Sequence, residues 1–235
     1  MSAVPPFLLP ADEAERLRSL RAYDVQSALD EPVFNEIVAL TARIFSLPIS
    51  LIALVEAEVV HYPVNHGMPD NAVQPREGAL CSTAILHDNA VVYRDLAVET
   101  SPLVTPEAAH AAHQNNLRFY AGAPLRMPGD HNIGTLCVID HQPRNFSGPE
   151  QHTLEQMATL VAHAVTVRHT CYAGPAGEQH WQTIRAQLQE ELQGLTALVR
   201  YLYARYGNPT PVPPDLLAQV ERRLQQSHEV LAAQV

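Results

Sequence analysis

The sequence contains no lysine, and all 15 of its basic residues are arginines. Without a lysine amine the chain cannot form Schiff bases with carbonyl cofactors, and it lacks the lysine that P-loop proteins and protein kinases need. Basic charge is also scarce, because 25 acidic residues leave a net charge of −10. Phosphate backbones bind to clustered basic residues, and the arginines do not cluster here. We therefore expect no nucleic-acid partner.

Cysteine is scarce too, and long apolar runs are absent. Cys81, Cys137 and Cys171 are too few and too scattered for a disulfide framework, and no CxxC pair indicates zinc. No apolar run approaches the roughly 20 residues that a bilayer span needs. The first 15 residues lack the basic region and the long apolar core of a signal peptide. We expect a cytoplasmic protein without a membrane partner.

The most informative stretch runs from Arg118 to Arg144. Two apolar runs, FYAGAPLRM and NIGTLCVID, are joined by Pro128-Gly129-Asp130, which predicts a β-hairpin with a tight turn. The second run is almost continuously apolar, so we expect a central strand that is covered on both faces. Gly122 and Gly134 indicate places where another backbone or a ligand comes close.

The segments before the hairpin predict a mixed α and β domain. Residues 10–13 open a first helix, and a second follows Asp30, which can cap it, with Val33, Ile37, Leu40 and Ile44 at helical spacing. ISLIALVE, VVHYPVNHG and AVVYRDL predict strands, and Pro63 within the second marks an edge or a bulge. The irregular segments 65–89 and 99–116 should cover one face of the sheet. Ser147 and Glu150 form a capping box for a helix on the other face.

The hairpin also carries a family resemblance. FYAGAPLR, then IGTLCVID and a PR dipeptide, resembles the terminal strand pair of GAF domains, and ERLRSLRAYD with LPISLIALVE extends the resemblance to roughly residues 11 to 170. It implies an α/β (α+β) sandwich with a central antiparallel sheet of five or six strands, helices on one face and loops on the other. It also implies a sensory or regulatory module of bacterial signal transduction, with a signalling protein as partner.

Beyond this domain, taken as residues 1–170, the sequence predicts a C-terminal helical hairpin in residues 171–235. The linker is placed at Cys171 to Gly177, and two amphipathic helices are separated by GNPTPVPP. Leu192 and Val199 widen the apolar stripe of the first helix, so a further surface must cover them. That surface is either the sheet-side helices of the same chain or the hairpin of a second molecule. The common use of flanking helices for dimerisation in GAF proteins favours a homodimer.

The GAF resemblance implies a small-ligand pocket between the sheet and the loops. The alternative is a closed cavity in a purely structural interaction module, in which polar side chains only satisfy local hydrogen bonds. The sequence identifies no cofactor. The polar candidates for the pocket are His61, Tyr62, Asn65, His66, Arg76, Cys81, Ser82, Thr83, Asp95, Arg118, Tyr120, Thr135 and Asp140.

The family that the chain resembles also includes enzymes and cofactor-binding proteins, which give two alternatives. Cys81, in EGALCSTAIL, precedes a short helix that can lower its pKa, and the free methionine-(R)-sulfoxide reductases carry a cysteine in a similar stretch. Those enzymes need further cysteines in the next crossing, and residues 88–120 contain none. We therefore expect no catalysis, with Cys137 in a small apolar role.

Three further ligand classes have weak support in the sequence. PEAAHAAHQNN lacks the cysteine through which phytochrome-type GAF domains attach a bilin. The signature of cyclic-nucleotide GAF domains is not visible either. Haem or a metal stays open as an alternative, because His61, His66, His110 and His113 flank the expected pocket. His228 lacks the sequence context of a phosphoacceptor.

Overall fold

The computed structural model describes residues 4–68, 73–175 and 177–233. Its centre is one six-stranded sheet in the order β3-β2-β1-β6-β5-β4, and every neighbouring pair is antiparallel. The predicted sandwich, including its sheet of five or six strands, is confirmed. The strands are β1 (Ile49–Val55), β2 (Val59–His66), β3 (Val73–Pro75), β4 (Val91–Tyr93), β5 (Phe119–Met127) and β6 (His131–Asp140).

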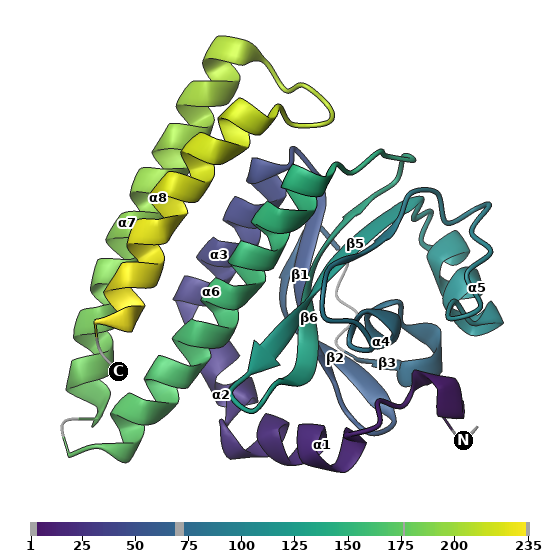
Figure 1. Cartoon of the computed structure of the whole chain (residues 1–235), viewed down its shortest axis with the longest axis horizontal. Coiled ribbons are helices and arrows are strands. Elements are labelled where there is room, and N and C mark those ends of the chain that lie inside the picture. The colour runs from purple at the N-terminus through teal and green to yellow at the C-terminus, as the bar shows by residue number, and fades with distance from the viewer. Residues whose placement is uncertain (1–3, 69–72, 176, 234–235) are drawn as a thin grey trace.

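Helices cover one face of the sheet, and short helices with loops cover the other (Figure 1). The long helices α3 and α6 lie on the first face, while α4 and α5 lie on the second. The helical segments are η1 (Pro6–Leu8), α1 (Glu13–Ala22), α2 (Val25–Leu29), α3 (Pro32–Ile44), η2 (Arg76–Gly78), α4 (Cys81–Ala84), α5 (Pro106–Gln114), α6 (Gly148–Ala173), α7 (Gly177–Tyr206) and α8 (Pro214–Ala232).

Local sequence signals explain most helix starts. The Ser147 side chain accepts from the Glu150 N–H, and the Glu150 carboxylate accepts from the Ser147 N–H, so the predicted capping box begins α6. Thr105 caps α5 by accepting from the Ala108 N–H. The prediction for Asp30 is wrong: Asp30 ends α2, and Glu31 precedes α3 without a side-chain cap.

Strand β6, the second strand of the hairpin, lies in the middle of the sheet, as predicted. Strand β6 pairs with β5 on one side and with β1 on the other. A Cβ added to Gly134 would lie 2.1 Å from the carbonyl oxygen of Ala53, so the strand needs glycine where the β1 backbone approaches. A Cβ on Gly122 would lie 2.2 Å from the hydroxyl of Tyr120. Gly122 therefore leaves room for a neighbouring side chain on the loop-covered face.

Pro63 produces a β-bulge in β2, one of the two outcomes that the sequence leaves open. Ile52 pairs with Val64 and Leu54 pairs with His61, so two residues of β2 lie opposite one residue of β1. Proline cannot donate to the ladder, which explains why the extra residue lies here. As a result Tyr62 packs with the core under the loops, while Val64, two residues later, packs with the core under the helices.

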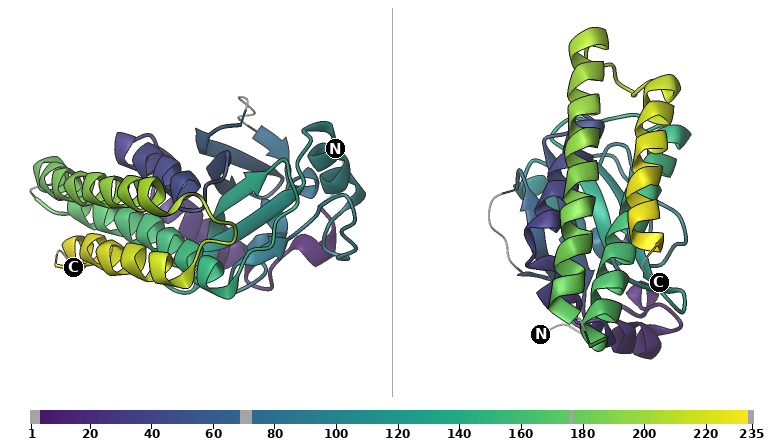
Figure 2. Two further views of the ribbon diagram at one scale, coloured as in Figure 1. Left: turned by 90° about the horizontal axis from the view of Figure 1, so that it is seen from above. Right: turned by 90° about the vertical axis from the view of Figure 1, so that its left-hand side faces the viewer.

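The C-terminal hairpin packs against the chain's own helices. Helices α7 and α8 lie over α3 and α6, on the side away from the sheet, so the four helices pack together as a bundle (Figure 2). Leu192 and Val199 are buried there at 1% and 2% exposure. Trp181 is buried as well, and its indole Nε1 donates to Glu31 over 2.7 Å. Of the two coverings that the sequence leaves open, the structure shows the sheet-side helices of the same chain.

This arrangement changes the basis of two predictions. Helix α6 continues to Ala173, so the predicted linker begins inside its last turn, and linker position 176 lies outside the described residues. The homodimer stays a prediction, but the apolar stripe of the hairpin is buried within the chain and no longer supports it.

No helix among the described residues has the length and apolar character needed to cross a membrane.

Candidate functional site

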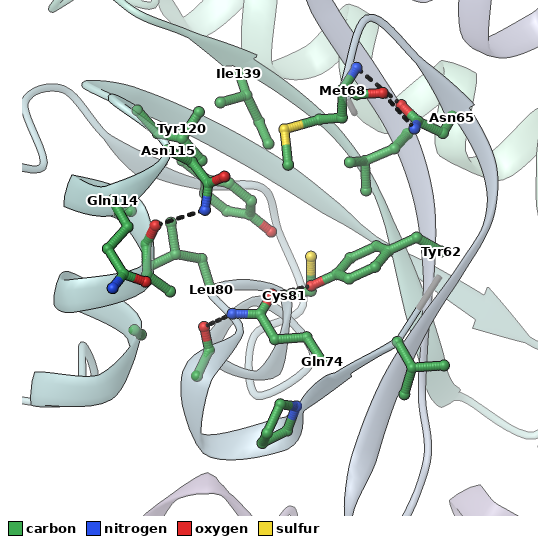
Figure 3. Close-up of a pocket in the computed structure, with 18 residues that line it drawn as sticks. Tyr62, Asn65, Met68, Gln74, Leu80, Cys81, Gln114, Asn115, Tyr120 and Ile139 are labelled. Carbon is green, nitrogen blue, oxygen red and sulfur yellow. Dashed lines mark hydrogen bonds between the residues drawn. The ribbon is translucent and has the colours of Figure 1, made fainter. Parts of the chain in front are cut away.

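A cavity of about 230 Å³ lies on the loop-covered face of the sheet (Figure 3). Its floor is made by Leu51 of β1, Tyr120 of β5 and Ile139 of β6. Residues of β2, β3, α4 and α5 form the walls. The lining is largely apolar, with leucine, methionine and alanine side chains, and its polar members are Tyr62, Asn65, Gln74, Cys81, Gln114, Asn115 and Tyr120.

Several of these polar groups are already engaged with one another. The Tyr62 hydroxyl donates to Oε1 of Gln74 over 2.9 Å, and Nε2 of Gln74 donates to the carbonyl of Gly78. Both polar atoms of the Asn65 side chain bond to the backbone of Met68. These contacts hold the β2-β3 wall in shape, so the same atoms are not available to a ligand without rearrangement.

Tyr120 differs from these residues, because its hydroxyl makes no hydrogen bond of normal geometry to a described residue, although the Cys81 thiol and the Thr135 hydroxyl lie near it. The side chain is 1% exposed, and its ring stacks on Tyr93 with 6.0 Å between centroids. Gly122 leaves the space in which the hydroxyl lies. The Oγ1 atom of Thr135, next to this group, is also buried and unpartnered within the described structure. A buried hydroxyl without a hydrogen bond costs about 1–3 kcal/mol, so a polar ligand or water is expected at this point.

Cys81, Cys137 and the hydroxyls of Tyr120 and Thr135 lie close enough to influence one another's protonation. The neighbouring Cys137 thiol lowers the pKa of Cys81, and the hydroxyls of Thr135 and Tyr120 lower it further, against the opposing effect of burial. Burial raises the pKa of Cys137 well above its ordinary value. Burial also raises the pKa of Tyr120, so its hydroxyl stays protonated and can donate. Cys137 is fully buried in the apolar group under the loops, as the sequence predicts, and Thr135, Cys137 and Ile139 alternate onto one face of β6.

Among the predicted site residues, Tyr62, Asn65, Cys81 and Tyr120 line the cavity, and Thr135 lies behind it. His61 and His66 do not. His61 faces Glu56, with 3.5 Å between the imidazole and the carboxylate, and His66 lies at an exposed hollow beside Tyr203. The bulge at Pro63 explains the difference: Tyr62 before it and Asn65 after it face the loops, so His61 and His66, next to them in the strand, point to the other face.

Arg76, Ser82 and Thr83 also lie outside the lining. The Arg76 guanidinium is fully buried and bonds to the Glu13 carboxylate and to the Leu8 carbonyl, which fastens α1 to η2. Ser82 donates to the Arg76 carbonyl. Thr83 donates to the Leu80 carbonyl and accepts from the Tyr93 hydroxyl. The N-terminal helix supplies the partner that a buried arginine needs, and a sequence pattern does not show that pairing.

Three charged candidates have structural roles at the edges of the loop layer. Asp95 and Arg118 form a two-pronged ion pair with distances of 2.8 Å, and it ties the crossing after β4 to the start of β5. Asp140 accepts from the backbone N–H groups of the two residues that follow it.

The sequence did not predict that Met68, Gln74, Gln114 and Asn115 line the cavity. These residues lie in or beside irregular segments without a periodic signal.

The four histidines that the sequence places around the pocket do not line the cavity in the described structure. His110 and His113 are exposed on α5. No group of three or more histidine, cysteine, aspartate or glutamate side chains among the described residues is arranged to hold a metal ion.

Comparisons with known proteins identify the relatives of this chain. The GAF domain family matches residues 14–165. A cyclic di-GMP phosphodiesterase of Pseudomonas aeruginosa is 31% identical over 218 residues, which are 92% of this chain and 34% of that protein. The chain therefore spans about a third of the length of this curated relative.

Solved structures with a similar fold include three GAF-type proteins. The PixJ GAF domain of Thermosynechococcus elongatus is 15% identical, with a TM-score of 0.49, over 70% of this chain and 96% of its own. The GAF domain of an Acinetobacter phosphoenolpyruvate-protein phosphotransferase is 13% identical, with a TM-score of 0.46, over 68% and 98%. A type II free methionine-R-sulfoxide reductase from Thermoplasma acidophilum is 18% identical, with a TM-score of 0.45, over 58% and 94%.

The comparison with curated proteins corrects one expectation. The sequence predicts a protein that is not an enzyme, because the cysteines of the sulfoxide reductases are missing. The Pseudomonas relative, which is similar over most of this chain, is named as a phosphodiesterase and is therefore an enzyme. The missing cysteines bear on one reaction only, and neither they nor the missing lysine exclude the hydrolysis of a phosphodiester.

Proposed function

Because the chain belongs to the GAF family, we propose that it is a sensory region of a protein that breaks down cyclic di-GMP. In this proposal a small molecule binds in the cavity on the loop-covered face and changes the rate at which the cyclic dinucleotide is hydrolysed. A role in signalling agrees with the GAF family and with the phosphodiesterase relative.

One observation supports the sensory part above the others. The cavity contains a buried hydroxyl, that of Tyr120, with no hydrogen-bond partner among the described residues. Folded proteins pair the great majority of buried polar groups, so an unpaired hydroxyl on a residue that lines the cavity favours an occupant that reaches and completes it. A closed, purely structural cavity would gain nothing from this hydroxyl.

The sheet offers a short route from the cavity to the helical layer. Tyr120 faces the cavity, and its neighbours Phe119 and Ala121 belong to the core under the helices. Phe119 contacts Phe146, with 5.5 Å between ring centroids, just before α6 begins. An occupant that shifts β5 would therefore press on α6 and on the hairpin that covers it. A packed core passes such a shift on, because it has few voids to absorb it.

A cytoplasmic homodimer belongs to the same proposal. It is supported by the common use of flanking helices for dimerisation in GAF proteins, and the outer faces of α7 and α8 are the surfaces available for it. Light scattering on the full chain at about 50 μM, a concentration above weak-dimer dissociation constants, should give twice the chain mass. A monomer at that concentration would remove the dimer from the proposal.

The test of the sensory function uses a matched pair of substitutions on α5. Ala111 lines the cavity and is half-buried, whereas Ala109 is exposed on the same helix. Hydrolysis of cyclic di-GMP to the linear dinucleotide is measured for the protein that carries this chain, and the cellular level of cyclic di-GMP is measured alongside. Ala111→Phe fills the cavity and should change the hydrolysis rate several-fold, while Ala109→Phe should leave it unchanged.

Two results would count against the proposal. Equal hydrolysis rates and equal cellular levels for the wild type and both variants would show that the cavity does not regulate the reaction. A wild-type protein that does not hydrolyse cyclic di-GMP, and whose loss leaves the cellular level unchanged, would remove the link to this nucleotide.

A further inference from the structure

The lining of the cavity carries no charge among the described residues. Of the 18 residues that line it, none is aspartate, glutamate, arginine or histidine. Two arginines on this side of the sheet form ion pairs outside the lining: Arg118 with Asp95, and Arg76 with Glu13. An ion that entered this space would lose its hydration without gaining a counter-charge, which is strongly unfavourable.

The polar atoms that remain available suit hydrogen bonds with a neutral molecule. The Tyr120 hydroxyl has no partner, and its raised pKa keeps it protonated. Asn115 uses its Nδ2 to donate to the Ala111 carbonyl over 2.8 Å, and its Oδ1 accepts from no described residue. Asn115 and Tyr120 both line the cavity and are labelled in Figure 3. The lining therefore offers one donor and one acceptor on a largely apolar surface.

The volume of the cavity limits the occupant as well. About 230 Å³ is below the range of roughly 300–1,000 Å³ for pockets that enclose drug-sized ligands. A cyclic dinucleotide, with two bases and two charged phosphodiesters, is too large and too highly charged for this space. Free amino acids are small enough, but they carry two charges that the lining does not complement.

Resting on the proposed function, we infer that the cavity selects a small uncharged molecule with an apolar body and one polar group. The apolar body packs against Leu51, Leu80 and Ile139. The polar group bonds to the Tyr120 hydroxyl and presents a donor to Oδ1 of Asn115, as a primary carboxamide does. Cyclic di-GMP is then the substrate of the proposed protein and not the ligand of this cavity.

The experiment uses probes that share a skeleton and differ in charge. A set of aromatic and short aliphatic carboxamides is compared with the carboxylates and amines of the same skeletons, by ligand-observed NMR on the full chain at pH 7. Binding to the cavity is recognised by loss of signal with Ala111→Phe and retention with Ala109→Phe. We expect carboxamides to bind at least about tenfold more tightly than their charged counterparts.

Substitutions of two stacked tyrosines identify the polar contact. Tyr120→Phe removes the hydroxyl at the cavity and should weaken carboxamide binding up to about tenfold, the effect of one hydrogen bond. Tyr93→Phe removes the hydroxyl that bonds to Thr83, outside the lining, and should leave binding unchanged. Thermal unfolding of each variant verifies that it is folded.

The outcomes separate this inference from the proposed function. If carboxylates or amines bind the cavity as tightly as carboxamides, or if cyclic di-GMP displaces the probes, the uncharged class is wrong and the sensory cavity stands. If Tyr120→Phe and Tyr93→Phe weaken binding equally, the assigned contact is wrong. If no probe of any class binds in a way that depends on Ala111, both the inference and the ligand-binding part of the proposed function fail.

Discussion

The two faces of the sheet differ in how completely they are filled. Under α3 and α6, the core contains Phe34, Ile52, Leu136 and many other buried apolar side chains, and it continues into the hairpin through Trp181. Under the loops, a smaller apolar group that includes Leu51 and Ile139 borders a cavity. The same strands supply both cores through alternate residues. The face under the helices is closely packed, whereas the face under the loops keeps a cavity, which costs stability.

The two faces also differ in whether they contain buried, hydrogen-bonded carboxylates. Under the helices, Glu150 is fully buried and accepts from Arg144, from both donors of Ser147 and from the Val212 backbone. Glu31 likewise accepts from side chains of α6 and α7. These bonds join the hairpin to the domain. On the loop-covered face no described carboxylate lines the cavity, and the hydroxyl of Tyr120 is left unpaired.

The largest effect is expected from Trp181→Ala in the helical layer. The indole is 1% exposed and also bonds to Glu31, so the substitution leaves a large void and an acceptor with one donor fewer. Loss of a buried tryptophan costs about 3–5 kcal/mol. Chemical denaturation should show this decrease in the free energy of unfolding. Tyr201→Ala on the exposed face of α7, where the side chain is 53% exposed, is the control and should change stability little. Equal effects of the two would mean that α7 does not pack on α3 and α6.

The second prediction concerns Gly134, where β6 approaches β1. A Cβ would lie 2.1 Å from the Ala53 carbonyl, so Gly134→Val must move the backbone of a central strand. We expect a cost of about 1–3 kcal/mol, measured as a lower midpoint of thermal unfolding. Gly148 has nothing within 4 Å of its added Cβ, and Gly148→Val should leave the midpoint nearly unchanged. An unchanged midpoint for Gly134→Val would contradict the strand register.

The third prediction concerns Glu13, which holds the N-terminal helix to the loop layer. Burial raises the pKa of Glu13, but its bonds to Arg16 and Arg76 outweigh this and lower the pKa below its ordinary value of 4.5. Glu13→Gln leaves both buried guanidinium groups without their carboxylate and should cost about 2 kcal/mol at neutral pH.

The sign of this effect predicts its pH dependence. Because the folded pKa is lowered, the stability that Glu13 contributes is present above pH 4.5 and is lost as the pH falls through the lowered value. The difference between wild type and Glu13→Gln should therefore shrink below pH 4.5. A difference that stays constant down to pH 3 would show that Glu13 does not titrate with folding.

Local patterns were sufficient to predict much of the fold. Ile37, Leu40 and Ile44, at helical spacing, are all buried on α3, and the Ser147 capping box begins α6. Gly134 indicated a close backbone approach, and Pro63 indicated a bulge. Each of these signals acts within a few residues or within one strand pair, so a single sequence contains the information.

The candidate site was predictable only in part, because its assignments depend on long-range pairing. Arg76 bonds to Glu13, 63 residues away, and Cys81 meets Cys137 from a distant strand. Neither pairing leaves a periodic pattern. The covering of the hairpin was open for the same reason: an apolar stripe shows that a surface must be buried but does not identify what buries it.

The smallest expected effect is the sharpest test of the contrast between the two faces. Tyr120→Phe removes a buried hydroxyl that has no partner in the described structure, so the empty protein should become more stable by about 1 kcal/mol. Tyr93→Phe removes the hydroxyl that donates to Thr83 over 2.8 Å and should lower stability by a similar amount. The two rings stack on each other, so the comparison holds their surroundings nearly constant.

Co-purified small molecules are removed, and both variants are denatured in parallel with the wild type. The free energies of unfolding should change in opposite directions for the two variants. Addition of a carboxamide that binds the cavity should then stabilise the wild type more than Tyr120→Phe, because the ligand binds more tightly to the folded form that carries the hydroxyl. If Tyr120→Phe is destabilised as much as Tyr93→Phe, the Tyr120 hydroxyl already has a partner in the empty protein. The polar group beside the cavity would then be satisfied without a ligand, and the two faces would no longer differ in this respect.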